Sequence, residues 1–171
     1  METSWMGRYR SLVAALVQHG NLAGKNVGKK NDIGDGIMLS AQEWQILEHI
    51  LEYHDETCNM VTMSNRLGVP QSSFSRAVKV LCSAGLVDKY QAVNNRKNII
   101  LKPTEYGCRL YERNAARLLQ EQFRPFFDML EPISDEDLNT VIRAIEYLNV
   151  SMDPDLQAGA SPQLIKIEQQ K

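Results

Sequence analysis

Long apolar runs and paired cysteines are both missing from this 171-residue sequence. No stretch approaches the roughly 18 consecutive apolar residues that a membrane-spanning helix requires. The basic residues and apolar run near the N-terminus precede no small-residue cleavage site, so we expect no secretory signal peptide. Cys58, Cys82 and Cys108 are odd in number and form no Cys-x-x-Cys pair, which favours a reduced, cytoplasmic protein over a disulfide-built one.

Acidic residues are missing from one segment of a chain that is acidic overall. The segment LGVPQSSFSRAVKVLCSAGLV (67–87) contains four serines but no Asp or Glu, whereas the whole chain has a formal net charge of −2. Between residues 62 and 102, seven basic residues stand against the single acid Asp88, a local charge of +6. Such asymmetry concentrates positive potential on one module, so we predict that it binds a polyanion rather than forming only a solvated basic face.

The sequence also lacks the patterns that would indicate an enzyme, a cofactor site or a metal site. His19, His49 and His54 do not have the spacing that places two metal ligands on one helix face. The serines of segment 67–87 lie in no Gly-x-Ser-x-Gly motif, and the glycine-rich segment 20–36 has no P-loop pattern and no preceding strand. We therefore predict a non-enzymatic protein without a cofactor or a bound metal.

Apolar periodicity predicts a mainly α-helical chain with one small β-hairpin. A capping box of Ser40 and Glu43 marks the start of one helix, and Thr104 can cap another. The pair Asn94-Asn95 suits a tight turn between two strands, and Pro125 should kink the longest helix. The expected helices cover about residues 5–17, 41–54, 62–67, 71–84, 104–130 and 134–150, the strands cover 86–93 and 96–101, and 20–36 is expected to be a loop after a helix stop at Gly20.

The acid-poor part of the chain has the organisation of a winged helix-turn-helix. A short helix, a turn at residues 68–70, a second helix and a hairpin follow one another. On the second helix Phe74, Ala77, Val78 and Leu81 recur at helical spacing and are expected to face inward. The other face and the hairpin tip carry residues that can contact base edges and phosphates, namely Gln71, Ser72, Ser73, Ser75, Arg76, Lys79, Asn94, Asn95, Arg96 and Lys97.

The segments LSAQEWQIL, TMSNRLGVPQSSFSRAVKVLCSAGLV and NNRKNIILKPTEYG together resemble the MarR family of winged-helix transcription regulators. The resemblance covers about residues 38–150 and is most specific in the helix that begins at QSS, in the GLV that enters the wing and in TEYG. It implies a homodimer built from the N- and C-terminal helices, whose two recognition helices enter successive major grooves of a pseudo-palindromic duplex. It also implies that a wing arginine, at the position of Arg96, reaches the minor groove.

Three residues depart from the family pattern. Asn95 stands where an aspartate usually braces the wing arginine, Pro70 replaces the usual serine cap of the recognition helix, and Pro103 replaces a leucine. The first departure weakens the expectation that Arg96 is held rigidly. The loop at 20–36 is longer than usual, so the neighbouring pocket should be unusual as well.

We predict four regions in the chain. Residues 1–37 form an N-terminal dimerisation helix and a glycine-rich loop, 38–103 form the DNA-binding domain, 104–151 form C-terminal dimerisation helices, and 152–171 form a largely unordered tail. The predicted function is that of a homodimeric transcription regulator, and more specifically a repressor. We expect it to bind double-stranded DNA and no membrane. A small-molecule effector would bind a pocket lined by Trp5, His19 and Trp44.

Two other interpretations stay open. Oxidation of Cys82 or Cys108 would disturb DNA docking in a thiol-based sensor, although a small buried structural residue is the simpler interpretation of each. A winged helix can also serve as a protein-binding module, in which the basic face meets an acidic partner.

Overall fold

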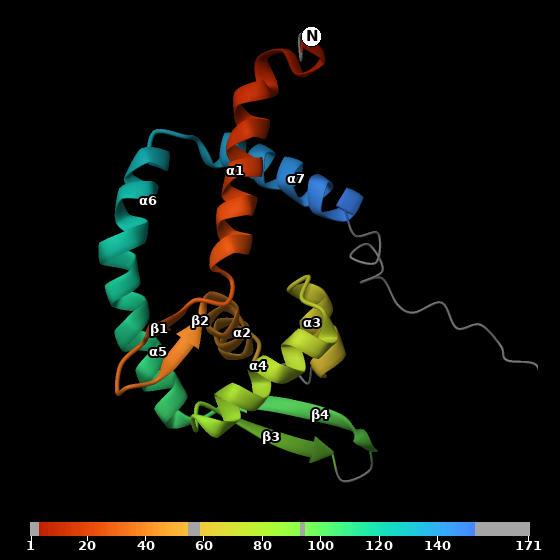
Figure 1. Ribbon diagram of the computed structural model, residues 1–171, viewed down its shortest axis with the longest axis vertical. Coiled ribbons are helices and arrows are strands. Elements are labelled where there is room, and N and C mark those ends of the chain that lie inside the picture. Colours follow the sequence, from red (N-terminus) through yellow and green to blue (C-terminus); the bar gives the residue numbers. More distant parts are fainter. Residues whose placement is uncertain (1–3, 55–58, 93–94, 153–171) are drawn as a thin grey trace, which may run out of the picture.

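The computed structural model describes residues 4–54, 59–92 and 95–152. Helices dominate, and the named strands pair into two antiparallel hairpins, β1–β2 and β3–β4 (Figure 1). The predicted fold class, mainly α with a β-hairpin wing in a winged helix-turn-helix, is confirmed. The elements in chain order are η1 (Ser4–Tyr9), α1 (Arg10–Asn26), β1 (Lys30–Asp32), β2 (Met38–Ser40), α2 (Ala41–Glu52), α3 (Met60–Arg66), α4 (Gln71–Ser83), β3 (Val87–Ala92), β4 (Asn95–Pro103), α5 (Glu105–Leu118), η2 (Leu119–Phe123), α6 (Arg124–Leu130) and α7 (Asp135–Met152).

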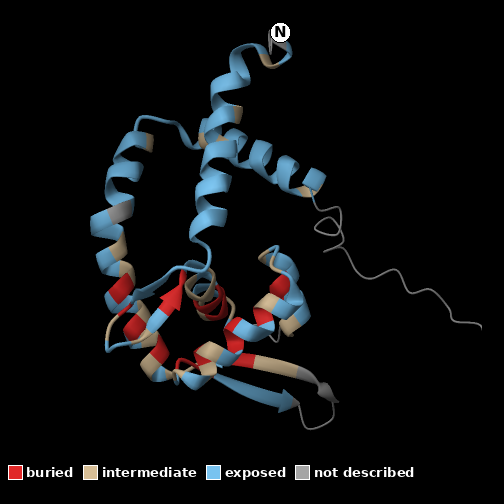
Figure 2. Ribbon diagram, viewed as in Figure 1, coloured by how far each residue is buried: buried red, intermediate tan, exposed pale blue. Residues whose placement is uncertain are grey.

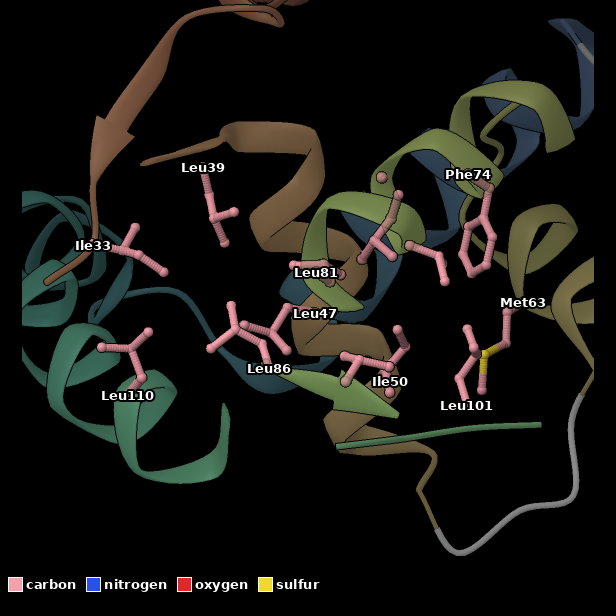
Figure 3. Close-up of a cluster of buried hydrophobic side chains, with 14 residues drawn as sticks. Ile33, Leu39, Leu47, Ile50, Met63, Phe74, Leu81, Leu86, Leu101 and Leu110 are labelled. Carbon is pink, nitrogen blue, oxygen red and sulfur yellow. The ribbon is translucent and has the colours of Figure 1, made fainter. Parts of the chain in front are cut away.

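The hydrophobic core lies between α2, α3, α4 and the β3–β4 hairpin, with residues of β2 and α5 at its edge. Figure 3 shows Phe74 and Leu81 of α4 among the side chains that converge there from these elements. All four residues predicted to face inward from α4 are buried, with relative exposures of 0% to 4%. Full burial of one large apolar side chain contributes about 1.5–3 kcal/mol to stability. This inner face therefore holds α4 in the winged-helix lobe, which consists of α2, α3, α4 and the β3–β4 hairpin.

Local signals set the ends of the two helix-turn-helix helices. Gly68 follows α3 and Gly85 follows α4, with φ angles of 62° and 70° that glycine adopts without strain. The helix α3 begins two residues earlier than predicted, because the side chain of Asn59 accepts a hydrogen bond from Thr62 N at 2.9 Å and caps it there. Pro70 precedes α4 and makes no side-chain capping bond.

The N-terminal helix is longer than the sequence predicted. A helix over 5–17 that stops at Gly20 was expected, but the 3-10 segment η1 leads into α1, which continues through Gly20 and Gly24 to Asn26. Glycine in a helix interior costs about 1 kcal/mol relative to alanine, which weakens a helix without ending it. The predicted loop is therefore wrong for residues 20–26.

An unexpected hairpin, β1–β2, begins in the remainder of that loop and ends at Ser40, just beyond it. Ile33 and Leu39 from this hairpin are buried in the core. Residues 34–36 all have positive φ, including the non-glycine Asp35 at 56°, and form the tight turn between the strands. The Asp35 carboxylate accepts hydrogen bonds from the Tyr106 hydroxyl at 3.0 Å and from Arg113 Nη2 at 2.8 Å, so the turn is held against α5.

The segments α5, η2 and α6 follow one another as a single helical column (Figure 1). Thr104 caps α5 as predicted, accepting from Gly107 N at 2.9 Å. A kink was predicted at Pro125, and the structure has a π-helical turn just before it, in which Arg124 N–H donates to Leu119 O, five residues earlier. Proline has no N–H to donate, so the regular ladder of hydrogen bonds is interrupted at this point.

None of the residues of α1 or α7 is buried, which Figure 2 shows as two helices without buried segments. Ser134 caps α7, since its side-chain oxygen accepts a hydrogen bond from Asp137 N at 3.1 Å. Residues 153–171 of the predicted tail lie outside the described residues. The exposed large apolar residues of these two helices include Leu12, Val17, Leu22, Val141, Ile142, Ile145 and Leu148.

Candidate nucleic-acid interface

The outer face of α4 is polar, exposed and free of acidic residues. The sequence of this helix, QSSFSRAVKVLCS, places its apolar residues on the buried face, which leaves the short polar side chains and two cations outside. Of the residues predicted to contact DNA from α4, Ser73 is half-buried and the others are exposed, namely Gln71, Ser72, Ser75, Arg76 and Lys79. These side chains can donate hydrogen bonds to phosphates and base edges, and no carboxylate on the helix would repel a polyanion.

Arg76 is oriented by its own helix. Its Nε donates to Ser72 O at 3.3 Å, and its Nη2 donates to Ser73 Oγ at 3.2 Å. These contacts point the guanidinium toward the N-terminal half of α4. A recognition helix presents that half to the major groove, so Arg76 is placed where a base or a phosphate would be met.

The wing is an antiparallel ribbon whose register is irregular near its tip. Val87 pairs with Pro103 and Ala92 with Asn95, with a register shift between Gln91 and Ala92. Asn95, Arg96 and Lys97 belong to β4, but their side chains and the whole of Asn94 lie outside the described residues. The predicted wing contacts therefore stay predictions.

A hollow of about 390 Å³ lies between α3, the N-terminal half of α4 and the wing. Gln71 and Ser75 line it from α4, while Asn59, the N-cap of α3, and Lys89 of β3 line its other sides. Neither Asn59 nor Lys89 is among the contacts predicted from the sequence. The sequence shows that Lys89 is basic, but it does not show that Lys89 lies beside α4, because that position depends on how the hairpin packs.

A second cavity, of about 520 Å³, lies where the β1–β2 hairpin, α2, α5 and the π turn meet. Its lining includes Trp44, Asn114 and Arg117. Arg117 Nη2 donates to Asn114 Oδ1 at 2.7 Å and to Asp32 O at 3.2 Å, which joins α5 to the hairpin on one side of the cavity. Aromatic and polar groups thus share one concave site, as is usual for small-molecule pockets.

The residues predicted to line a ligand pocket occupy different parts of the chain. Trp44 lies on α2 at this cavity, stacked on Tyr111 with ring centroids 4.9 Å apart. Tyr111 also donates to Glu48 Oε1 at 2.5 Å, and burial together with that carboxylate raises the pKa of Tyr111 to about 12. Trp5 lies in η1 with a relative exposure of 81%, and His19 is exposed on α1.

Two of the cysteines can be placed. Cys82 on α4 and Cys108 on α5 are both half-buried free thiols. Burial raises the pKa of the Cys82 thiol, so its reactive thiolate form is disfavoured at neutral pH. Cys58 lies outside the described residues. The observation on Cys82 favours a structural role over oxidant sensing at this position.

The sequence of the lobe matches a known family. A model of the MarR family matches residues 39–97, which run from β2 through the recognition helix into the wing. Over these residues the sequence matches that of a MarR-family winged helix. The resemblance expected from the segments around α4 is confirmed.

Two of the proteins to which this chain is similar are transcription regulators. The HTH-type transcriptional regulator PchR of Bacillus subtilis is 19% identical over 111 residues, and the match spans 65% of each chain. Among solved structures, the S. aureus MepR–DNA complex is similar with a TM-score of 0.60 and 12% identity, covering 84% of this chain and 96% of the other. PcaV from Streptomyces coelicolor, solved with its natural ligand, has a TM-score of 0.58 and 16% identity, covering 90% of this chain and 100% of PcaV.

The solved structures extend the likeness beyond the matched lobe at the level of fold alone. Both solved structures cover most of the chain, so the helices outside residues 39–97 share the architecture of these regulators. In the part of the chain that the structure describes, no group of three or more potential ligands could hold a metal ion, and no helix is long and apolar enough to cross a membrane.

Proposed function

We propose that this chain is a MarR-family transcription regulator that binds a pseudo-palindromic DNA duplex as a homodimer and represses the adjoining gene. The observation that carries the proposal is the outer face of α4, which is exposed, rich in hydroxyl groups and free of acids in a chain of net charge −2. A helix with these properties can lie in a major groove, where carboxylates would be repelled by the phosphates. Gln71, Ser72, Ser73 and Ser75 would contact bases or nearby phosphates, and Arg76 and Lys79 would contact bases or backbone.

The homodimer is supported by the apolar surface outside the winged-helix lobe. Phe123, Phe126 and Phe127 on η2 and α6 have relative exposures of 47%, 53% and 46%, and α1 and α7 bury none of their residues. Contiguous apolar surface of this kind marks an interaction site. A two-fold pairing of these helices would cover the surface and place two copies of α4 about one turn of DNA apart.

Regulation by a small molecule would use the cavity beside Trp44. The cavity touches the β1–β2 hairpin, α2 and α5, so an occupant would contact the lobe and the outer helices at once. Leu39 lines this cavity and also another hollow, whose lining includes Lys79 and Val80 of α4. A displacement of the hairpin would therefore alter the surroundings of the recognition helix. A ligand that binds one arrangement of these elements better than the other would shift DNA affinity.

The test is a selection from a random duplex library at a physiological ionic strength of about 0.15 M. The proposal predicts enrichment of an inverted repeat, with half-site centres about one helical turn apart. Arg76→Ala should lower affinity for the enriched duplex, whereas the matched change Arg109→Ala at an exposed position of α5 should not. Salt-labile binding without any enriched sequence would contradict a sequence-specific regulator and favour a module that binds an acidic protein partner.

A further inference from the structure

We propose that the hollow between α3, α4 and the wing binds a backbone phosphate and its deoxyribose, and that Lys89 supplies the positive charge of this site. We name this site the phosphate seat. This inference rests on the proposed DNA-binding function and adds a contact site to it. It assigns Lys89 and Asn59 a part in binding that is separate from the outer face of α4.

The register of the wing places Lys89 on the helix-facing side. Lys89 pairs with Leu101 and lies two residues after Val87, and both of these apolar residues have relative exposures of 1%. Cross-strand partners and alternate residues share one face of a hairpin. Lys89 therefore emerges from the same face as the core residues, toward α3 and α4, while Asp88 and Lys102 pair on the opposite face.

The polar groups that line the hollow are suited to an anion. Gln71 and Ser75 stand one turn apart on α4 and can both donate hydrogen bonds into it. The Oδ1 atom of Asn59 is used as the cap of α3, accepting from Thr62 N at 2.9 Å and from Thr62 Oγ1 at 3.2 Å, which leaves its amide N–H groups as donors. Lys89 adds the positive charge, and no carboxylate lines the hollow among the described residues.

The remaining lining is apolar and suits a sugar. Met60, Val61 and Ile99 complete the wall of the hollow. A nucleic-acid backbone alternates an anionic phosphate with a less polar deoxyribose, so donors beside an apolar wall match one repeat of the backbone. Since Gln71 and Ser75 belong to the recognition helix, a strand that borders the groove occupied by α4 would cross the hollow.

Lys89→Gln tests the seat, with Lys102→Gln as the matched control on the outer face of the same hairpin. Losing one phosphate contact in each subunit of a dimer should make the slope of log K against log salt shallower by about 2 and weaken all duplex sequences alike, while Lys102→Gln should change the slope by less than about 0.5. Equal effects of the two substitutions would overturn the seat while leaving the proposed function intact. A wild-type protein that binds no duplex would overturn both.

Asn59→Asp is a second and independent variant. Aspartate caps a helix as well as asparagine does, so the thermal unfolding midpoint should stay close to that of the wild type. The new carboxylate would face the phosphate, and duplex affinity should fall about tenfold or more. Ser134→Asp adds the same charge at the cap of α7 and serves as its control. Unchanged affinity of folded Asn59→Asp would contradict the seat.

Discussion

Asp35 and Arg113 form an ion pair across 78 positions of sequence, with 2.8 Å between Asp35 Oδ2 and Arg113 Nη2. The pair holds the turn of the β1–β2 hairpin against α5, and the Tyr106 hydroxyl adds a second bond to the same oxygen. The hydrogen bond from Arg113 lowers the pKa of the Asp35 carboxyl below its ordinary value of 3.8, and the hydrogen bond from Tyr106 adds a smaller effect in the same direction. The hairpin in turn lies against the cavity beside Trp44, so this contact connects α5 to the proposed regulatory site.

The ion pair predicts a specific dependence of stability on pH. Because the folded-state pKa of Asp35 is lowered, its contribution is present above about pH 3.8 and is lost as the pH falls through the folded-state value. Asp35→Asn, which tolerates the same positive φ, should therefore be less stable than the wild type at pH 6, and the difference should disappear in strong acid. Urea unfolding at pH 6 and pH 2.5 measures it, and a difference that persists unchanged at pH 2.5 would rule out the carboxylate as its source.

Gly107 should not accept a side chain. A Cβ atom at this position would lie 2.2 Å from the backbone oxygen of Leu86, and neither α5 nor the start of the wing can move apart without disturbing the core. Gly107→Ala should destabilise the protein by about 1–3 kcal/mol or more, despite the better helix propensity of alanine. Glu112→Ala on the exposed face of α5 should change stability by no more than about 0.5 kcal/mol. Equal unfolding midpoints for the two variants would show that α5 does not pack as closely as described.

The exposed aromatic residues of α6 should be required for dimerisation. Phe126→Asp places a charge among Phe123 and Phe127, and desolvating that charge in an interface would oppose pairing. We expect a folded monomer by sedimentation velocity and a salt slope of about half the dimer value. Tyr90→Asp on the exposed wing should stay dimeric. A Phe126→Asp protein that sediments as a dimer would place the interface elsewhere.

Arg96 should carry a sequence-dependent contact. If its guanidinium enters a narrow A·T-rich minor groove, Arg96→Ala should cost more affinity on duplexes with A·T pairs flanking the half-site than on G·C-flanked duplexes. Titration of both duplex sets by fluorescence anisotropy measures the difference. A uniform loss would indicate that Arg96 contacts phosphates alone, which is the effect expected of Lys97.

Local patterns predicted those parts of the fold that depend on nearby residues. The Ser40–Glu43 capping box, the buried face of α4 around Phe74, and the Thr104 cap all join residues within a few positions, and all were confirmed. The β1–β2 hairpin was not predicted, because its turn is held by Tyr106 and Arg113, far away in the sequence.

The same distinction applies to the candidate interface. The polar residues of α4 follow from helical periodicity, since any helix with Phe74 inward must turn Ser72 and Arg76 outward. Lys89 could not be assigned in this way, because its place beside Gln71 depends on the pairing register of the wing and on the packing of α4 over it.

The salt dependence of duplex affinity tests the central claim most directly. If Arg76, Lys79, Arg96 and Lys97 each meet a phosphate in both subunits, about eight counterions leave on binding, and the slope of log K against log salt should be about −7. A phosphate contact from Lys89 in each subunit steepens the expected slope to about −9. Anisotropy titrations of the selected duplex from about 50 to 300 mM salt give the value. A slope of −7 or steeper agrees with the account, and a slope shallower than about −3 would contradict it.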